Sequence, residues 1–80
     1  MLADRQKNTF AKKLKSGEEL WVGAYCPTGV SEEDRKEAEE YSAQNGIKYF
    51  IYKYVIVFYS DESQIDKIKE RVKYQVEGLI

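Results

Sequence analysis

The stretch of residues 47–60 constrains the fold most. Its β-branched and aromatic side chains favour a β-strand, and a single strand of that length is longer than a small domain. A straight strand of this length spans roughly 45 Å at ~3.3 Å per residue. A compact chain of 80 residues has a diameter of only roughly 30 Å. Residues 47–59 therefore predict the central β-structure of the domain, and this β-structure must bend or extend outward.

Three geometries satisfy this length limit. They are a tight hairpin near Tyr52 and Lys53, a bulged strand, and a β-arm that projects into a partner. A two-residue hairpin loop needs positive φ, which Asn-Gly or Asp-Gly normally provides, so Tyr-Lys is a poor choice for that loop. All three geometries stay open at the level of the sequence.

Hydrophobic periodicity predicts a helix near each end of the chain. Gly17 ends the N-terminal helix. Its apolar stripe, at spacings that are multiples of four with alanines beside it, consists of Leu2, Ala3, Phe10, Ala11 and Leu14. Ser60 or Asp61 caps the start of the C-terminal helix. Its apolar residues recur at spacings of three and four, and they are Ile65, Ile68, Val72, Val76 and Leu79. We expect the C-terminal helix to pack on the sheet.

A strand and a further helix are predicted between Gly17 and residue 47. Residues 20–26 alternate in a way that places apolar side chains on both faces of a strand, and the turn residues 27–29 end it. Ser31 then predicts a helix N-cap, with Asp34 as an acidic form of the capping box. This helix should run to about Gln44 and end at Asn45-Gly46, with a largely solvated surface.

The fold class predicted from these elements is α+β, as one domain over residues 1–80 in the order α-β-α-β(β)-α. We expect a sheet of two or three strands per chain with the C-terminal helix packed on one face. A chain of this size buries only about 60% of the surface that it exposes when unfolded, so its core is thin. A thin core favours self-association, and we expect a homodimer.

The composition indicates a cytoplasmic protein that does not enter membranes. No apolar stretch approaches the ~20 residues of a membrane span, since Lys48 and Lys53 interrupt the longest one. Residues 1–15 carry charges throughout and lack the apolar core of a secretory signal. Cys26 is the only cysteine, which fits a reducing compartment.

The residue inventory argues against an enzyme. The chain has no histidine, which removes the usual general base, the common catalytic triads and the commonest zinc ligand. Its glycines lie outside any phosphate-binding motif, so we expect no nucleotide cofactor, and indeed no cofactor of any kind. The acidic residues of 32–40 lack the spacing of a calcium loop, so we expect no metal site. These acids are expected to form a solvated helix face.

Cys26 is the one residue with reactive potential, because it ends a predicted strand shortly before a helix N-terminus. It has no second cysteine in a Cys-x-x-Cys spacing, and Glu32 occupies the place of the arginine in the phosphatase pattern. We therefore interpret Cys26 as a buried structural thiol.

The remaining hypotheses concern binding, and the first is protein recognition. A sheet of few strands has exposed edges, and the chain has more aromatic residues than so small a core readily hides. We expect a non-enzymatic regulatory or inhibitory protein that binds a macromolecular partner and itself, such as a small phage or bacterial accessory protein. The expected contact residues are Trp21, Tyr49, Tyr52, Lys53 and Tyr54.

The alternative is a module that binds single-stranded nucleic acid. Lys48, Tyr52 and Tyr54 combine charge with stacking surfaces, and Lys12, Lys13 and Lys15 are suited to follow a phosphate backbone. The acidic helix and the net charge of −1 argue against this hypothesis. A DNA-mimicking inhibitor is also disfavoured, because the chain has no extended acidic run.

Overall fold

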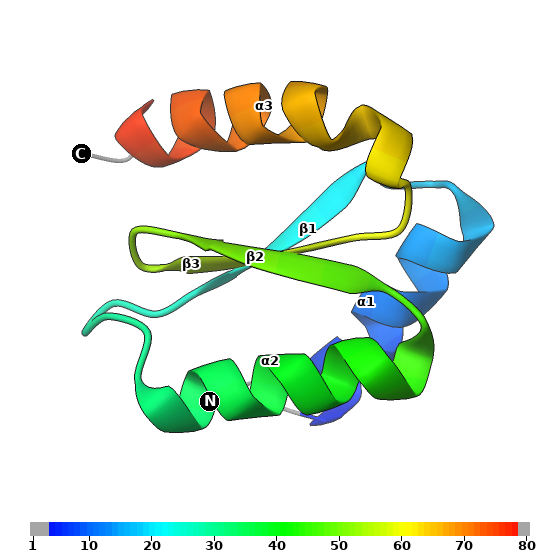
Figure 1. The fold of residues 1–80 in the computed structure, drawn as a ribbon, viewed down its shortest axis with the longest axis horizontal. Helices are drawn as coiled ribbons and strands as arrows, with labels where there is room; N and C mark the ends of the chain where they lie inside the picture. The colour runs from blue at the N-terminus through cyan, green and yellow to red at the C-terminus, as the bar shows by residue number, and fades with distance from the viewer. Residues whose placement is uncertain (1–3, 79–80) are drawn as a thin grey trace.

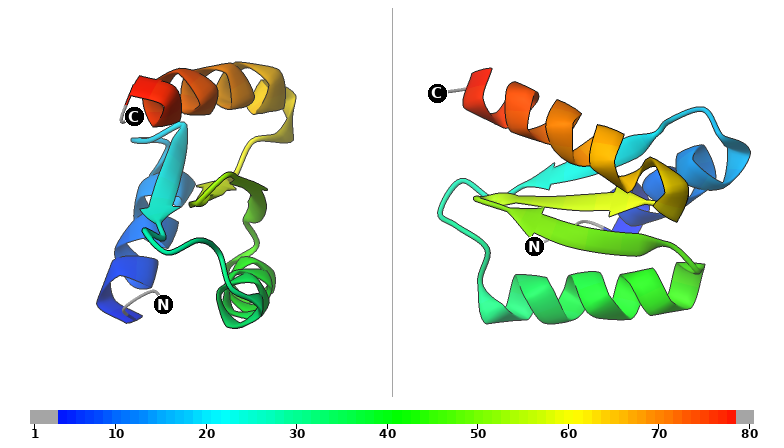
Figure 2. Two further views of the ribbon diagram at one scale, coloured as in Figure 1. Left: turned by 90° about the vertical axis from the view of Figure 1, so that its left-hand side faces the viewer. Right: turned by 45° about the horizontal axis from the view of Figure 1, so that its top comes forward.

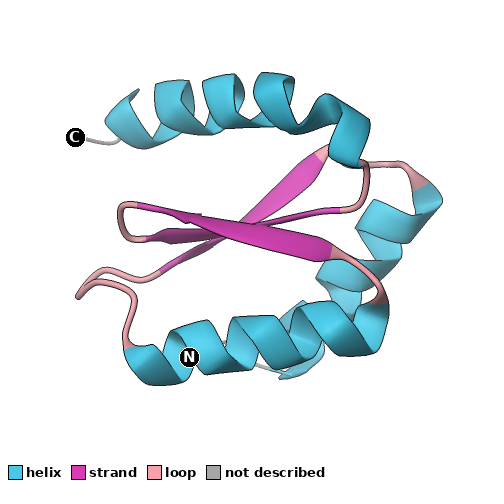
Figure 3. Cartoon of the chain, in the orientation of Figure 1, coloured by secondary structure: helices cyan, strands magenta, loops and turns pink. Residues whose placement is uncertain are grey.

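A computed structural model describes residues 4–78 and gives the predicted order of helices and strands (Figure 1 and Figure 3). The molecule measures 30 × 27 × 17 Å along its principal axes. Its elements are α1 (Asp4–Ser16), β1 (Trp21–Tyr25), α2 (Glu32–Asn45), β2 (Lys48–Tyr52), β3 (Val55–Tyr59), the short 3-10 helix η1 (Glu62–Gln64) and α3 (Ile65–Gly78).

The sheet has three strands in the order β1-β3-β2, and β3 runs antiparallel to both neighbours. The fold class is therefore α+β, as predicted. The two edge strands run parallel to one another on opposite sides of β3, and the connection through α2 carries the chain from one edge to the other. All five residues of β3 are buried, because this strand has a neighbour on each side and helices over both faces.

The helices form two layers around the sheet, with α3 over one face and α1 and α2 over the other (Figure 2). The α3 face buries Val55, Val57 and Tyr59 of β3 against Ile68, Val72 and Val76 of α3. The prediction that the C-terminal helix packs on the sheet through these α3 residues is confirmed. Leu2, Ala3 and Leu79, which were also predicted to lie on helix stripes, fall outside the described residues.

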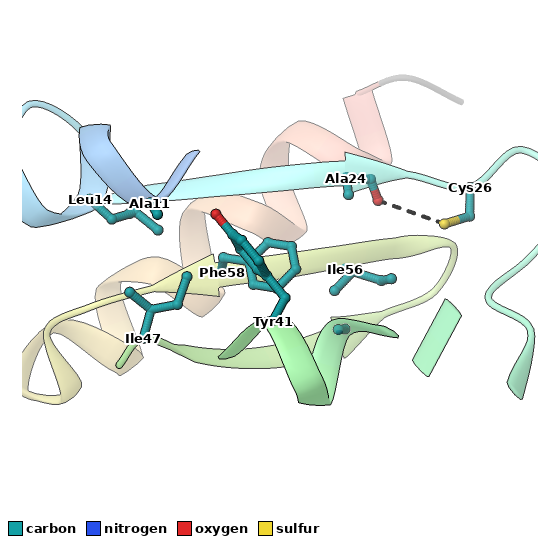
Figure 4. Packing of buried hydrophobic residues seen from close by; sticks show 9 residues of the cluster. Ala11, Leu14, Ala24, Cys26, Tyr41, Ile47, Ile56 and Phe58 are labelled. Atoms are coloured by element: carbon teal, nitrogen blue, oxygen red, sulfur yellow. Dashed lines mark hydrogen bonds between the residues drawn. The ribbon is translucent and has the colours of Figure 1, made fainter. Parts of the chain in front are cut away.

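The opposite face is built around Phe58, which is fully buried (Figure 4). Its ring meets Tyr41 edge to face at a centroid distance of 5.1 Å, and the rings of Phe10 and Tyr49 lie at 6.5 and 6.4 Å. Tyr41 comes from α2 and Phe10 from α1, so one β3 side chain holds both helices. Aromatic pairs of this kind add stability beyond the area they bury.

Residues 47–60 form a hairpin, which decides among the three predicted geometries. Tyr52 pairs with Val55, so the loop consists of Lys53 and Tyr54, one residue later than the position considered from the sequence. Lys53 adopts a φ of 53°, a conformation that costs a residue with a Cβ about 1 kcal/mol. The loop forms in spite of this cost because Tyr52 and Tyr54 both pack against the α3-side core.

Local signals define both ends of α2 as the sequence predicts. The Asp34 N–H donates to Ser31 Oγ at 3.1 Å, and the Ser31 N–H donates to Asp34 Oδ2 at 3.2 Å, which completes the capping box. Gly46 ends the helix with a φ of 63°, in the left-handed region that glycine enters without steric cost. Only Ala38 and Tyr41 of this helix are buried, so most of its surface is solvated.

Candidate protein-interaction site

The backbone of β1 offers unpaired hydrogen-bonding groups at the edge of the sheet. The Cys26 N–H donates to the Tyr54 carbonyl at 2.8 Å, directly beyond the last β1–β3 pair. Hydrogen-bonded and non-bonded pairs alternate along an antiparallel ladder, so Ala24 and Val22 also point their N–H and C=O groups toward β3. It follows that Trp21, Gly23 and Tyr25 point theirs away from the sheet.

This outer side of β1 is open to solvent. Gly23 and Tyr25 are exposed, and Tyr25 is one of two large hydrophobic residues in the described part of the chain that are mostly exposed, at 61%. Between Glu19 and Glu32 the chain contains no charged residue, although 34% of the whole chain is charged. An uncharged open strand edge is a ready template for an additional strand.

The Trp21 indole reaches along β1 to Gly23 on the α3 side. A Cβ placed at Gly23 would lie 3.0 Å from Trp21 Cζ3 and 3.1 Å from a Val55 methyl carbon, so a larger residue would push the indole and Val55 aside. The indole is half-buried and packs against the α3-side core. Gly23 and the Trp21 indole therefore form an apolar surface beside the open strand edge.

A groove of about 700 Å³ runs between this surface and α3. Trp21, Gly23 and Tyr25 line its strand side, and Arg71 and Gln75 line its helix side. Lys13, Glu18 and Glu19 lie at its end. Because the groove carries two basic and two acidic side chains around an apolar floor, it suits an uncharged extended segment better than a polyanion.

Aromatic side chains continue this apolar surface at the hairpin end. The ring of Tyr25 meets that of Tyr54 edge to face, with centroids 5.6 Å apart. The Tyr52 hydroxyl donates to the Glu77 carboxylate at 3.2 Å, and the Lys53 ammonium lies 5.7 Å from the Tyr52 ring centroid. Burial, and then the charge of Glu77 and its hydrogen bond, raise the pKa of Tyr52.

The five residues predicted to contact a partner do not form one surface. Tyr52, Lys53 and Tyr54 gather at the hairpin end, whereas Trp21 lies at the other end of β1, where it pairs with Tyr59. Tyr49 packs on the opposite face of the sheet, against Phe58. Side chains alternate between the two faces of a regular strand. Tyr49 and Tyr52 are three residues apart in β2, so they point to opposite faces of the sheet.

The predicted contact residues left out four residues that line the groove: Gly23, Tyr25, Arg71 and Gln75. Tyr25 was detectable, because it has the same parity as Trp21 along β1 and therefore points to the same face. Arg71 and Gln75 were not detectable, since their place beside β1 depends on how α3 crosses the sheet. The edge position of β1 likewise depends on strand order.

The residues of the nucleic-acid alternative lie in two separate regions. Lys12, Lys13 and Lys15 are exposed on α1, and Lys13 lines the groove beside β1, whereas Lys48 and Tyr52 lie on β2 at the other edge of the sheet. Lys48 forms an ion pair with Glu62 at 3.3 Å and lies at the opposite end of β2 from Tyr52. This arrangement gives no continuous track of lysines and stacking rings.

Cys26 lies in the core, with 8% of its surface exposed. Burial, with the nearby Asp34 carboxylate, raises the pKa of its thiol, so little thiolate forms at neutral pH. Within residues 4–78 no three acidic or cysteine side chains converge in a way that could hold a metal ion. None of the helices in that range is long and apolar enough to cross a membrane.

Comparisons of the chain with protein-family models, with curated proteins and with solved structures find no match. The geometry of the β1 edge and its groove is therefore the basis for a functional proposal.

Proposed function

We propose that this chain is a non-enzymatic, cytoplasmic interaction protein that regulates or inhibits a macromolecular partner by adding a strand of that partner to its β1 edge. The observation that carries the proposal is the open, uncharged edge formed by Trp21, Gly23 and Tyr25 beside a groove with an apolar floor. In strand addition, main-chain hydrogen bonds provide affinity, and pockets for alternate side chains provide specificity.

The side chains along the groove support this mode of binding. A strand added to β1 would place every second side chain on the α3 side, beside the surface made by Trp21 and Gly23. Aromatic anchors such as Trp21 and Tyr25 are the residue types that dominate binding energy at protein interfaces. The raised pKa of the buried Cys26 thiol supports the non-enzymatic part of the proposal.

Paired affinity baits test this proposal in an extract of the native cell. Tyr25→Pro removes one outward N–H from β1 without removing a hydrogen bond to β3, so the fold should persist while strand addition weakens. Tyr74→Ala is the matched control, because Tyr74 is 81% exposed on α3 and lies outside the groove. A partner should be captured by the wild type and by Tyr74→Ala and lost with Tyr25→Pro. Equal capture by all three baits would contradict the proposal.

Single-stranded nucleic acid is the less favoured function, since its lysines and stacking rings lie apart. Fluorescence anisotropy with labelled single strands at low salt examines it directly. Binding that weakens after mutation of Lys12, Lys13 and Lys15, with Tyr25→Pro unaffected, would replace the proposal above with this one.

A further inference from the structure

We propose that the β1 edge also binds the same edge of a second copy of this chain, in one register that forms a continuous antiparallel sheet across two chains. The inference rests on the proposed function, because both use the outward groups of β1. It goes further by naming an occupant and the residues that face one another.

The register follows from which residues point outward. Pairing Gly23 with Gly23 of the partner subunit sets Trp21 against Tyr25 of the partner subunit, and Tyr25 against Trp21 of the partner subunit. Each of these three pairs exchanges two hydrogen bonds, so all the outward groups of β1 are satisfied in both chains. A shift by two residues leaves Trp21 or Tyr25 of each copy unpaired, and a shift by one sets outward residues against inward ones.

The side chains are compatible with this two-fold arrangement. Trp21, Gly23 and Tyr25 share the α3 face, so the indole that lies over Gly23 meets the same surface of the partner subunit across the axis. Cross-strand aromatic pairs then form between Trp21 of one chain and Tyr25 of the other, and such pairs stabilise a sheet. An isologous contact requires one surface that is complementary to itself, which this edge is.

Charge also permits this self-contact. The groove beside β1 carries Lys13 and Arg71 together with Glu18 and Glu19, so two facing grooves bring no excess of one sign together. The outer edge of β2 differs, because Lys48 and Lys53 flank its outward residues Tyr49 and Ile51. Lysines at a strand edge oppose further pairing, so β1 is the edge that self-associates.

The contact is small, and its strength is limited accordingly. Two five-residue strands with their aromatic neighbours bury an area at or below the low end of specific interfaces, roughly 1,200 Å² in total. We therefore expect a reversible dimer with a dissociation constant on the order of 100 μM. The affinity leaves room for a tighter partner to displace the second copy.

Residue-resolved amide hydrogen exchange tests the register with the unmodified chain. Between about 20 μM and about 1 mM protein, exchange of the Trp21, Gly23 and Tyr25 amides should slow several-fold, while Val22 and Ala24 stay protected throughout. Protection that appears at Tyr49 and Ile51 instead, or no change with concentration at any of these amides, would overturn the proposal.

Sedimentation equilibrium on two variants supplies the second measurement. Tyr25→Pro loses two of the interchain hydrogen bonds, one from each copy, and both Tyr25 rings, so it should weaken the dimer by roughly thirtyfold or more. Tyr25→Phe keeps the N–H and the ring and should dimerise as the wild type does. A dimer that is unchanged in Tyr25→Pro refutes this register. If the chain stays monomeric while a partner is still captured in a Tyr25-dependent way, self-association fails and the proposed function stands.

Discussion

Replacing Phe58 by leucine tests whether one β3 side chain holds α1 and α2 to the sheet. The swap keeps an apolar residue of similar volume, which by itself costs less than about 1.5 kcal/mol. It also removes the edge-to-face contact with Tyr41 at 5.1 Å, worth about 0.5–1.5 kcal/mol, and two weaker ring contacts with Phe10 and Tyr49. We expect a loss of about 2 kcal/mol.

Phe50→Leu is the matched control on the other face of the sheet. Phe50 is only half-buried and has one ring neighbour, Tyr59, at 5.8 Å, together with the Lys69 ammonium at 5.9 Å. The same chemical change should therefore cost less than about 1 kcal/mol. The difference between the stability losses of the two variants is the part that is due to the position of Phe58. The part that they share is the general cost of losing an aromatic ring.

Urea unfolding measured at about 5 μM protein, below self-association, provides the free energies. A domain of 80 residues has a total stability of about 4–12 kcal/mol, so the loss at Phe58 is a large fraction of it. With a slope near 1 kcal/mol per molar urea, the midpoint should fall by about 2 M for Phe58→Leu and by less than about 1 M for Phe50→Leu. Equal shifts for the two variants would refute the packing argument.

Further perturbations address the hydrogen bonds and titrating groups. Burial raises the pKa of Tyr41, and the Ala11 backbone near its hydroxyl partly offsets that rise. This hydroxyl, directed toward Ala11 in Figure 4, has no partner at full hydrogen-bonding geometry, so Tyr41→Phe should lower stability by less than about 1 kcal/mol or raise it in thermal unfolding; a larger loss would show that the Ala11 backbone is a strong partner. Ala24→Pro should cost about 1–3 kcal/mol by urea unfolding, because the lost N–H points toward β3 and leaves its acceptor there without a bond. Hydrogen bonds from Tyr59 and Lys48 hold the pKa of Glu62 below its usual value. These bonds therefore stabilise the fold above about pH 4.5, and their contribution to stability is lost as the pH falls through the lowered pKa. A Glu62→Gln variant whose stability keeps the full acid dependence of the wild type would contradict this. Burial and the Glu62 hydrogen bond raise the pKa of Tyr59, so stability should fall above about pH 10, followed by circular dichroism.

The elements that the sequence predicts well are those set by local chemistry. Ser31 and Asp34 start α2 through reciprocal hydrogen bonds between neighbours, and Gly46 ends it through its own backbone freedom. The apolar stripe of α3 likewise depends only on helical periodicity, so its packing on a sheet was predictable. None of these features requires knowledge of a distant part of the chain.

The hairpin loop and the candidate site depend on distant contacts and were less predictable. Lys53 occupies a conformation that its local preference opposes, and the loop forms because Tyr52 and Tyr54 pack on a core supplied by α3. The central position of β3 could have been inferred from the sequence, because residues 55–59 are continuously apolar, as a strand buried on both faces requires. With β3 in the centre of a three-stranded sheet, β1 must lie at an edge.

The two edges of the sheet together determine how far the proposed association can extend. If β1 pairs with β1 of the partner subunit, the outer strands of the joined sheet are the two β2 strands, each flanked by Lys48 and Lys53. Those lysines oppose a further strand, and a two-fold contact closes on itself, so assembly stops at two chains instead of forming a fibre. If this closed pairing occurs, it covers the uncharged β1 edge at concentrations above the dissociation constant, and variants that block pairing while leaving the edge apolar should be less soluble than the wild type in that range.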